Sequence, residues 1–326
     1  MAANSNLHKA KTAKNDEFYT QLMDVAKELM HYKEHFKDKV VFCNCDDPTY
    51  SAFWKYFHFN FNELGLKKLI STHYDCTEPT YKMEYYGGND NDVEDGIKTP
   101  LEGNGDFRNK ECLEILDECD IVVTNPPFSE FRLYVATLME HNKKFLIIGN
   151  KNAITYKEFF PLLKNNDVWI GYNNVKEFIQ PDGSIKKFGN IGWFTNLDIA
   201  KRYEKLILYK NFTQEEYPRY DNYLVWNCDK VSEIPLNDHI DIEVDEAELS
   251  WYRQIYPDLK ILENKKVRIH NPVYGVPITF MDNYNPEQFE IVAFRKGEDG
   301  QDLVFTREKE RVQPYFRILV RHRLQG

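Results

Sequence analysis

The sequence predicts an α/β protein with a mostly parallel sheet. In the first half of the chain, short apolar segments typical of strands alternate with segments typical of helices. Strands joined by helices form crossover units, which build a parallel sheet between layers of helices. The chain has 326 residues, of which 42% are hydrophobic and 15% aromatic. That is enough for a large core, in one elaborated domain or in two.

Apolar runs mark the expected strands, which fall at residues 39–45, 68–74, 120–124 and 144–150. Helices are expected at residues 51–63, 130–141 and 156–164. The stretch 75–105 is rich in Gly, Asn and Asp, which is typical of a loop or an insertion. Residues 175–180 and 185–195 flank the turn-forming segment 181–184 and predict an antiparallel hairpin.

Beyond residue 200 the expected elements are short and mixed. We therefore expect residues 1–200 to form the core that carries the chemistry, and residues 201–326 to complete the sheet and form a partner-binding surface. The sequence contains no apolar run of membrane-spanning length and no secretory signal, so a cytoplasmic protein with no membrane partner is expected. The six cysteines lack metal-binding spacing, and no metal is expected.

The net charge of −10 argues mildly against a nucleic-acid partner, because phosphate contacts need Lys and Arg. The local distribution of charge is the better test, however. Basic residues do gather in three stretches, at residues 176–187, 201–210 and 307–323. Any of these groups could instead be solvated surface, and for each group taken singly that is the better expectation.

The most informative segment is Asn125-Pro126-Pro127-Phe128, directly after the expected strand 120–124. Two prolines fix the backbone and remove two N–H donors, and Asn125 is held near an extended conformation because it precedes a proline. The loop is therefore stiff. It presents two acceptors, the Asn125 side-chain oxygen and the Pro126 carbonyl, beside the aromatic ring of Phe128.

These groups suit the activation of a planar amino group. The lone pair of such an amino group is delocalised into its ring, and two rigid acceptors of its hydrogens shift electron density back onto nitrogen. An aromatic side chain can stack on a base held out of the helix. The alternative is a tight strand-to-helix turn with Phe128 packed in the core. The loop by itself leaves open adenine N6, cytosine N4, an amino group in RNA or a glutamine amide in a protein.

At these residues the chain resembles the amino-group DNA methyltransferases, whose signature is (Asn/Asp/Ser)-Pro-Pro-(Tyr/Phe). More closely, it is similar to the EcoRI-type modification methyltransferases, which methylate adenine N6. The resemblance runs along nearly the whole chain in order and spacing, through KNDEFYTQ (14–21), VFCNCDDP (41–48), GDFR (105–108), DIVVTNPPF (120–128), WFTNLD (193–198) and YPRYDNY (217–223).

The resemblance implies a class I S-adenosylmethionine-dependent methyltransferase fold. Its sheet has seven strands, parallel except for one, and carries additional elements for DNA recognition. The expected hairpin would supply the antiparallel part. Implied with it are S-adenosylmethionine as cofactor, double-stranded DNA as substrate, action as a monomer, and a cognate restriction endonuclease that need not touch the chain. If the resemblance extends to specificity, the site is GAATTC, methylated at the inner adenine.

The resemblance also assigns cofactor contacts. Phe18, Tyr19 and Thr20 fall near the methionine end, where aromatic faces favour the cationic sulfonium. The two aromatic residues could also simply pack the N-terminus down, and the two interpretations are compatible. Asn44, Asp46 and Asp47 occupy the loop after the first strand, which here lacks the glycines of the general Phe-x-Gly-x-Gly pattern. Either aspartate could instead cap the following helix.

Two further cofactor contacts follow from the resemblance. Asp75 comes after the second strand, where an acidic residue commonly binds the ribose hydroxyls, with Glu78 as an alternative. Asp106 and Phe107 resemble the motif in which the carboxylate accepts from the cofactor adenine and the ring stacks on it. The alternative for Asp106 is a cap on the helix expected near Asn109.

Trp193 and Phe194 fall where the family places an aromatic contact to the extruded base, beside Phe128. A buried strand position is the equally weighted alternative. Candidate DNA contacts are the polar residues Lys176, Lys186, Lys187 and Arg219. A different class of function is an inactive, DNA-binding descendant of the family. The intact segments 105–107 and 125–128 argue against it.

Overall fold

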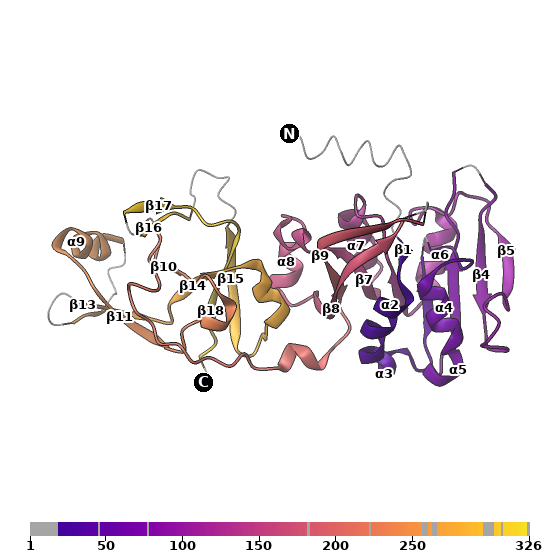
Figure 1. Ribbon diagram of the computed structural model, residues 1–326, viewed down its shortest axis with the longest axis horizontal. Coiled ribbons are helices and arrows are strands. Elements are labelled where there is room, and N and C mark those ends of the chain that lie inside the picture. The colour runs from indigo at the N-terminus through magenta and orange to yellow at the C-terminus, as the bar shows by residue number, and fades with distance from the viewer. Residues whose placement is uncertain are drawn as a thin grey trace. The chain divides into compact units, whose positions relative to one another are not determined.

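The computed structural model describes residues 19–44, 46–76, 78–180, 183–221, 223–255, 260–262, 266–295, 303–307 and 309–324. Phe18 and the turn residues Pro181 and Asp182 lie outside this part of the chain. The chain divides into two compact units, Met1–Ile199 and Ala200–Gly326 (Figure 1).

The first unit is built on one large sheet with the order β1-β8-β9-β7-β6-β2-β3-β4-β5. The strands are β1 (Tyr19–Thr20), β2 (Val40–Cys43), β3 (Lys68–Thr72), β4 (Tyr81–Tyr85), β5 (Ile97–Pro100), β6 (Ile121–Thr124), β7 (Lys144–Asn150), β8 (Trp169–Ile179) and β9 (Ile185–Thr195). At its centre β7, β6, β2 and β3 are parallel neighbours. These are the four strands that the apolar runs predict. β2 and β6 are buried along their whole length, as continuous apolar strands of parallel sheets are.

Antiparallel strands extend this parallel centre on both sides. β9, β8 and β1 follow one another beyond β7, and β4 and β5 follow beyond β3. The described sheet thus has nine strands and differs from the sheet of seven, with one antiparallel, that the resemblance implies. β4 and β5 lie in the stretch 75–105, which composition predicts to be a loop. β5 is a mostly exposed edge strand, so it carries no apolar row that a pattern could detect.

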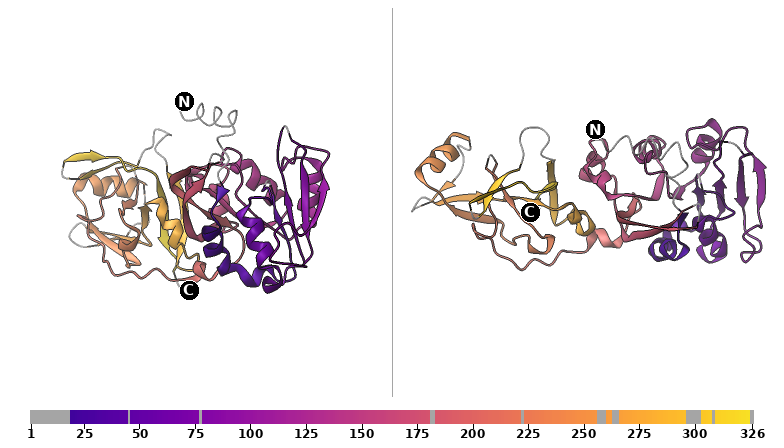
Figure 2. Two further views of the ribbon diagram at one scale, coloured as in Figure 1. Left: turned by 45° about the vertical axis from the view of Figure 1, so that its right-hand side comes forward. Right: turned by 45° about the horizontal axis from the view of Figure 1, so that its top comes forward.

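Helices cover both faces of the large sheet (Figure 2). Trp193 and Phe194 of β9 illustrate this, because the side chains of consecutive residues on a strand point to opposite faces of the sheet. The Trp193 ring contacts Phe53 of α4 (Ala52–Phe59) at 5.9 Å, whereas the Phe194 ring contacts Phe131 of α7 (Phe131–Glu140) at 5.1 Å. The remaining helices of this unit are α2 (Leu22–Leu29), α3 (Lys33–Phe36), α5 (Phe61–Leu64), α6 (Lys110–Glu118) and α8 (Phe160–Lys164).

The second unit has its own sheets. A four-stranded sheet has the order β10 (Val225–Asn227), β14 (Val273–Val276), β18 (Arg317–His322), β15 (Phe289–Arg295). The smaller sheets are β11 (His239–Glu243), β13 (Lys266–His270), β12 (Lys260–Ile261) and the pair β16 (Phe305–Arg307), β17 (Glu310–Val312). Its described α-helix is α9 (Glu246–Ile255).

The expectation that residues 201–326 complete the large sheet is therefore wrong. Both edge strands of that sheet, β1 and β5, come from the first unit, and the described strands after residue 200 pair among themselves. The weak periodicity of this region gave no information on which strands pair. None of the helices in the described ranges is long and apolar enough to cross a membrane.

Candidate active site

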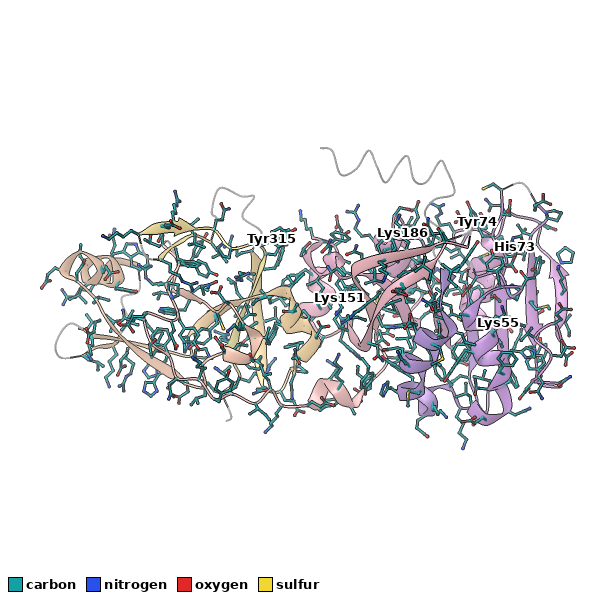
Figure 3. The ribbon with its side chains drawn as sticks, viewed as in Figure 1. Lys55, His73, Tyr74, Lys151, Lys186 and Tyr315 are labelled. Atoms are coloured by element: carbon teal, nitrogen blue, oxygen red, sulfur yellow. The ribbon has the colours of Figure 1, made fainter. Side chains whose placement is uncertain are left out.

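The carboxyl ends of β2, β3, β6 and β7 meet at one edge of the sheet, because these strands are parallel and in register. In open α/β sheets this edge is where ligands bind. The loops that leave it contain most of the residues that the sequence analysis selects. Figure 3 shows His73 and Tyr74 after β3 at the same end of the sheet as Lys186 at the start of β9.

The loop after β6 is a closed and stiff turn. The Thr124 hydroxyl donates to the carbonyl of Asn44 at 2.7 Å, which ties the start of the turn to the loop after β2. The amide of Glu130 donates to the carbonyl of Pro127 at 2.9 Å, and α7 begins at the next residue. Pro126 and the side-chain oxygen of Asn125 are buried. The two acceptors expected from the sequence are therefore held on a turn with little freedom.

Phe128 lies half-buried at the margin of the core. Its ring meets Phe178 of β8 and Phe188 of β9, each edge to face with 6.0 Å between ring centres. Phe178 and Phe188 contact each other in the same way at 5.5 Å. This cluster of three rings packs the Asn125–Phe128 loop against the β8–β9 hairpin. The alternative that Phe128 is packed in the core therefore holds only in part, because its ring packs on one side and stays partly exposed.

The short strand β1 brings the N-terminal motif to the same place. Thr20 pairs with Phe178, the residue whose ring touches Phe128. The Tyr19 ring lies 4.6 Å from that of Tyr50, in the loop after β2. The Thr20 hydroxyl oxygen is buried and has no hydrogen-bond partner within the described residues. Tyr19 and Thr20 therefore join the site, whereas the prediction for Phe18 lies outside the described part of the chain.

The loop after β2 folds over the end of β3. Asn44 is buried and its side-chain oxygen accepts from the Thr72 hydroxyl at 3.1 Å. The amide of Asp46 donates to the carbonyl of Thr72 at 2.9 Å, and the Ser71 hydroxyl donates to the carbonyl of Asp46. Asn44 thus holds the ends of three strands together.

Asp46 is a partly exposed residue whose carboxylate oxygen Oδ2 is buried. Burial raises its pKa from 3.8 to about 7, a hydrogen bond from Ser51 opposes the shift, and the neighbouring charge of Asp47 adds to it. Its Oδ2 atom is buried without a hydrogen-bond partner among the described residues. An acceptor oxygen that is buried without a hydrogen-bond donor destabilises the fold, and a bound donor or cation would offset this cost.

Asp47 is used differently. Its Oδ1 atom accepts from the amide and hydroxyl of Thr49, both at 2.8 Å, and from the Tyr81 hydroxyl at 2.9 Å. Its Oδ2 atom lies 3.5 Å from Nε2 of His73. Neither aspartate caps α4, since the capping group is Ser51, whose hydroxyl oxygen accepts from the amide of Trp54 at 3.0 Å. The capping alternative for Asp46 and Asp47 is wrong for that reason.

The segment 104–107 packs against the residues after β3. Gly105 has φ +76°, and a Cβ there would overlap the carbonyl oxygen of His73. The amide of Asp75 donates to the carbonyl of Asn104 at 3.1 Å. The Asp75 side chain accepts from the amide of Glu78 at 3.1 Å and so forms part of a turn. The two segments that the resemblance assigns to the cofactor adenine and ribose are thus neighbours.

Asp106 and Phe107 also have partners within the protein. The Asp106 carboxylate accepts from the Arg108 amide at 2.9 Å and from its Nε at 2.7 Å. The α6 helix begins at Lys110 with Asn109 at its N-cap, so Asp106 does not cap it. The Phe107 ring is buried and meets Tyr134 of α7 edge to face at 4.9 Å.

Trp193 and Phe194 have fully buried side chains. They lie on opposite faces of the sheet, one against α4 and the other against α7. A planar ligand cannot stack on both. Their burial favours the core alternative, and we leave both out of the site.

The four candidate DNA contacts differ in their surroundings. Lys176 and Lys186 are exposed on the hairpin, and Lys187 pairs across it with Glu177 at 2.9 Å. Arg219 is directed inward. Its guanidinium donates to the carbonyls of Tyr220 and Asp221 at 3.0 and 3.2 Å and lies over the Trp251 ring at 5.1 Å. Reading a base would break these contacts, so Arg219 does not fit that role.

The family model described as "Adenine-specific methyltransferase EcoRI" matches residues 6–258 and 264–323. The chain is 40% identical to the type II methyltransferase M.EcoRI of Escherichia coli, over 99% of this chain and 98% of that protein. It is 34% identical to M.MgeORF184P of Mycoplasma genitalium (88% and 85% covered) and to M.MpnI of Mycoplasma pneumoniae (87% and 84% covered), both type II methyltransferases.

No solved structure matches the chain. The family model covers nearly the whole sequence, and one of the relatives aligns from end to end at 40% identity. The chain therefore belongs to the family of EcoRI-type adenine-specific methyltransferases.

Proposed function

We propose that this enzyme transfers a methyl group from S-adenosylmethionine to N6 of an adenine turned out of double-stranded DNA. The main support for this proposal is that the motif segments lie together. The Asn125–Phe128 loop lies at the edge of the sheet where the Tyr19–Thr20 strand, the loop 44–51 and the segment 104–107 also end. An amino-activating loop and a set of buried polar groups thus occupy one edge.

Buried polar atoms support a bound polar ligand here. The hydroxyl of Thr20 and Oδ2 of Asp46 lack hydrogen-bond partners in the described chain, and buried polar groups are normally satisfied. S-adenosylmethionine, when bound, supplies an electrophilic methyl group on a cationic sulfur. In the proposal, Tyr19 faces this cationic end with its ring, and Asp46 attracts it with a carboxylate. Asp106 accepts from the cofactor adenine, and Phe107 forms an apolar wall.

The remaining cofactor candidates have supporting roles. Both polar groups of Asn44 named above are used to join strand ends, Asp47 orders its own turn, and Asp75 orders another. They shape the site rather than contact the ligand.

Asn125 and Pro126 are the proposed activating groups. The Asn125 oxygen and the Pro126 carbonyl each accept one hydrogen of the adenine amino group, which leaves the nitrogen lone pair aimed at the methyl. The prolines and the bond from Thr124 to Asn44 hold these acceptors in place, so little reorganisation is needed. Phe128 is the stacking surface for the base, and its contacts with Phe178 and Phe188 set its tilt.

DNA contacts are proposed on the hairpin that carries Phe178 and Phe188. Lys176 and Lys186 are exposed there, and Lys187 would exchange Glu177 for a phosphate. Recognition of GAATTC, action as a monomer and protection against a cognate endonuclease are further parts of the proposal. They rest on family membership.

The test is methyl transfer from radiolabelled S-adenosylmethionine to DNA, RNA and protein in parallel. We expect label in DNA only, with N6-methyladenine as the product after digestion to nucleosides. Asn125→Ala is the matched inactive variant. Label in RNA or protein, or N4-methylcytosine as the product, would replace the proposed substrate.

A further inference from the structure

His73 lies where three segments of the site meet, and neither the sequence motifs nor family membership assign it a role. It is the first residue after β3, and its amide donates to the carbonyl of Tyr81 at 2.9 Å. The preceding residue, Thr72, accepts from the amide of Asp46. Gly105 lies directly against the His73 carbonyl. His73 thus lies between the loop that carries Asp46 and the segment that carries Asp106.

The two ring nitrogens of His73 have different surroundings. Nε2 lies 3.5 Å from Oδ2 of Asp47, and the imidazole packs on the Tyr81 ring with 5.1 Å between centres. Nδ1 is buried and has no hydrogen-bond partner among the described residues. The carboxylate of Asp47 favours a proton on Nε2, because the partner of one ring nitrogen sets the tautomer of the other. Nδ1 is then an acceptor that the protein itself does not satisfy.

The missing partner has to be a donor. S-adenosylmethionine has three kinds: the ammonium of its methionine part, the amino group of its adenine, and the two hydroxyls of its ribose. In the proposed function Asp46 attracts the cationic end and Asp106 accepts from the adenine amino group. His73 lies between these two carboxylates along the edge, as the ribose lies between the two ends of the cofactor.

We propose that His73 binds the cofactor, with its Nδ1 accepting a hydrogen bond from a ribose hydroxyl while Asp47 holds the imidazole in the required tautomer. The inference rests on the proposed function. It assigns to His73 the ribose contact that the family resemblance predicts for Asp75. The Asp75 side chain is directed to the amide of Glu78, whereas His73 has the acceptor without a partner.

The experiment measures binding of S-adenosylhomocysteine by calorimetry to the wild-type chain and to three variants. Asparagine places an oxygen near the position of Nδ1, glutamine places its amide near Nε2, and phenylalanine keeps only the ring shape. We expect His73→Asn to bind within about threefold of wild type, and His73→Gln and His73→Phe to bind about tenfold more weakly, the loss of one hydrogen bond to a buried acceptor. If His73→Phe does not fold, His73→Gln alone supplies the variant that lacks the acceptor.

Cofactor analogues give the decisive comparison. The 2′-deoxy and 3′-deoxy forms of S-adenosylhomocysteine are titrated against the same proteins. One of them should lose about tenfold on the wild-type chain and less than threefold on His73→Phe or His73→Gln, because the partner of that hydroxyl is already absent. The positioning role of Asp47 predicts that Asp47→Asn lowers affinity for S-adenosylhomocysteine but not for that same deoxy analogue.

A matched control is His141, which pairs with Asp117 at 2.6 Å just after α7, beside the amino end of β7. His141→Phe should bind S-adenosylhomocysteine as the wild type does. The inference is overturned if His73→Gln binds like wild type, or if neither deoxy analogue loses affinity on the wild-type chain. Failure of the proposed function looks different, because the wild-type chain would then transfer no methyl group to DNA adenine.

Discussion

Asp46 offers a quantitative test, because a buried carboxylate affects folding stability in a pH-dependent way. The change is Asp46→Asn, which keeps the size of the side chain and removes its ionisation. The folded-state pKa of Asp46 is about 7, raised from 3.8 chiefly by burial. A carboxyl group with a raised folded pKa stabilises the fold fully below pH 3.8, and this contribution is lost as pH rises to 7.

The size of the effect follows from the shift. At about 1.4 kcal/mol per pKa unit, the whole window from pH 3.8 to about 7 corresponds to about 4 kcal/mol, as an order of magnitude. Asp46→Asn does not carry this cost at high pH. We therefore expect the free energy of unfolding of the wild type to fall by about 3 kcal/mol relative to that of Asp46→Asn between pH 5 and pH 8.

Urea unfolding followed by tryptophan fluorescence measures this difference at several pH values. Other carboxylates titrate in both proteins and cancel when the two curves are subtracted. The control is Asp167→Asn, an exposed aspartate, for which the difference should stay flat. Parallel curves for Asp46→Asn and the wild type would show that Asp46 has no raised pKa in the folded protein. The same variant should bind S-adenosylmethionine more weakly at pH 8, since a residue kept at a cost to stability suits a functional site.

Three further predictions concern other parts of the chain. Asn125→Ala should lower single-turnover methyl transfer roughly 100- to 1000-fold while cofactor affinity stays within about twofold, and near-normal transfer would exclude the acceptor role. Glu28→Ala removes a buried carboxylate that accepts from the Tyr32 hydroxyl and from the amides of Tyr172 and Asn173 at 2.7–2.8 Å. It should lower the free energy of unfolding by about 3 kcal/mol in urea, against almost no change for the exposed control Glu34→Ala, and a loss below about 1 kcal/mol would contradict this. Lys186→Ala should weaken DNA binding equally for all sequences and reduce the salt slope by about one, and an unchanged slope would remove the hairpin from the DNA surface.

The parallel centre of the sheet could be predicted from sequence because its strands are continuous apolar runs. β7 has the predicted bounds, and β2, β3 and β6 fall within the predicted ranges. β5 could not be predicted, since it is an exposed edge whose pairing with β4 depends on the rest of the sheet. β1 has two residues, too few for any periodicity, and its position follows only from its pairing with β8.

The site divides in the same way. Proline chemistry predicts the stiff turn at Asn125–Phe128 because its cause is local. The distinction between Asp46 and Asp47 is not local. It arises from Tyr81 on β4 and His73 just after β3, which contact Asp47, while Oδ2 of Asp46 stays buried without a partner among the described residues. Residue type makes Arg219 a reasonable DNA candidate, and only the folded structure shows that its guanidinium is used by the carbonyls of Tyr220 and Asp221 and by the Trp251 ring. His73 has no motif at all. The one signal available for it in the sequence is its place directly after the second parallel strand.

The central claim is that this site methylates adenine N6 in DNA. The most direct measurement is sequencing, with N6-methyladenine detection, of DNA modified in a methylation-deficient host by the expressed wild-type chain and by Asn125→Ala. We expect N6-methyladenine at one recurring sequence with the wild-type chain and none with the variant. Unmodified adenine in both samples, or equal modification by both, would contradict it.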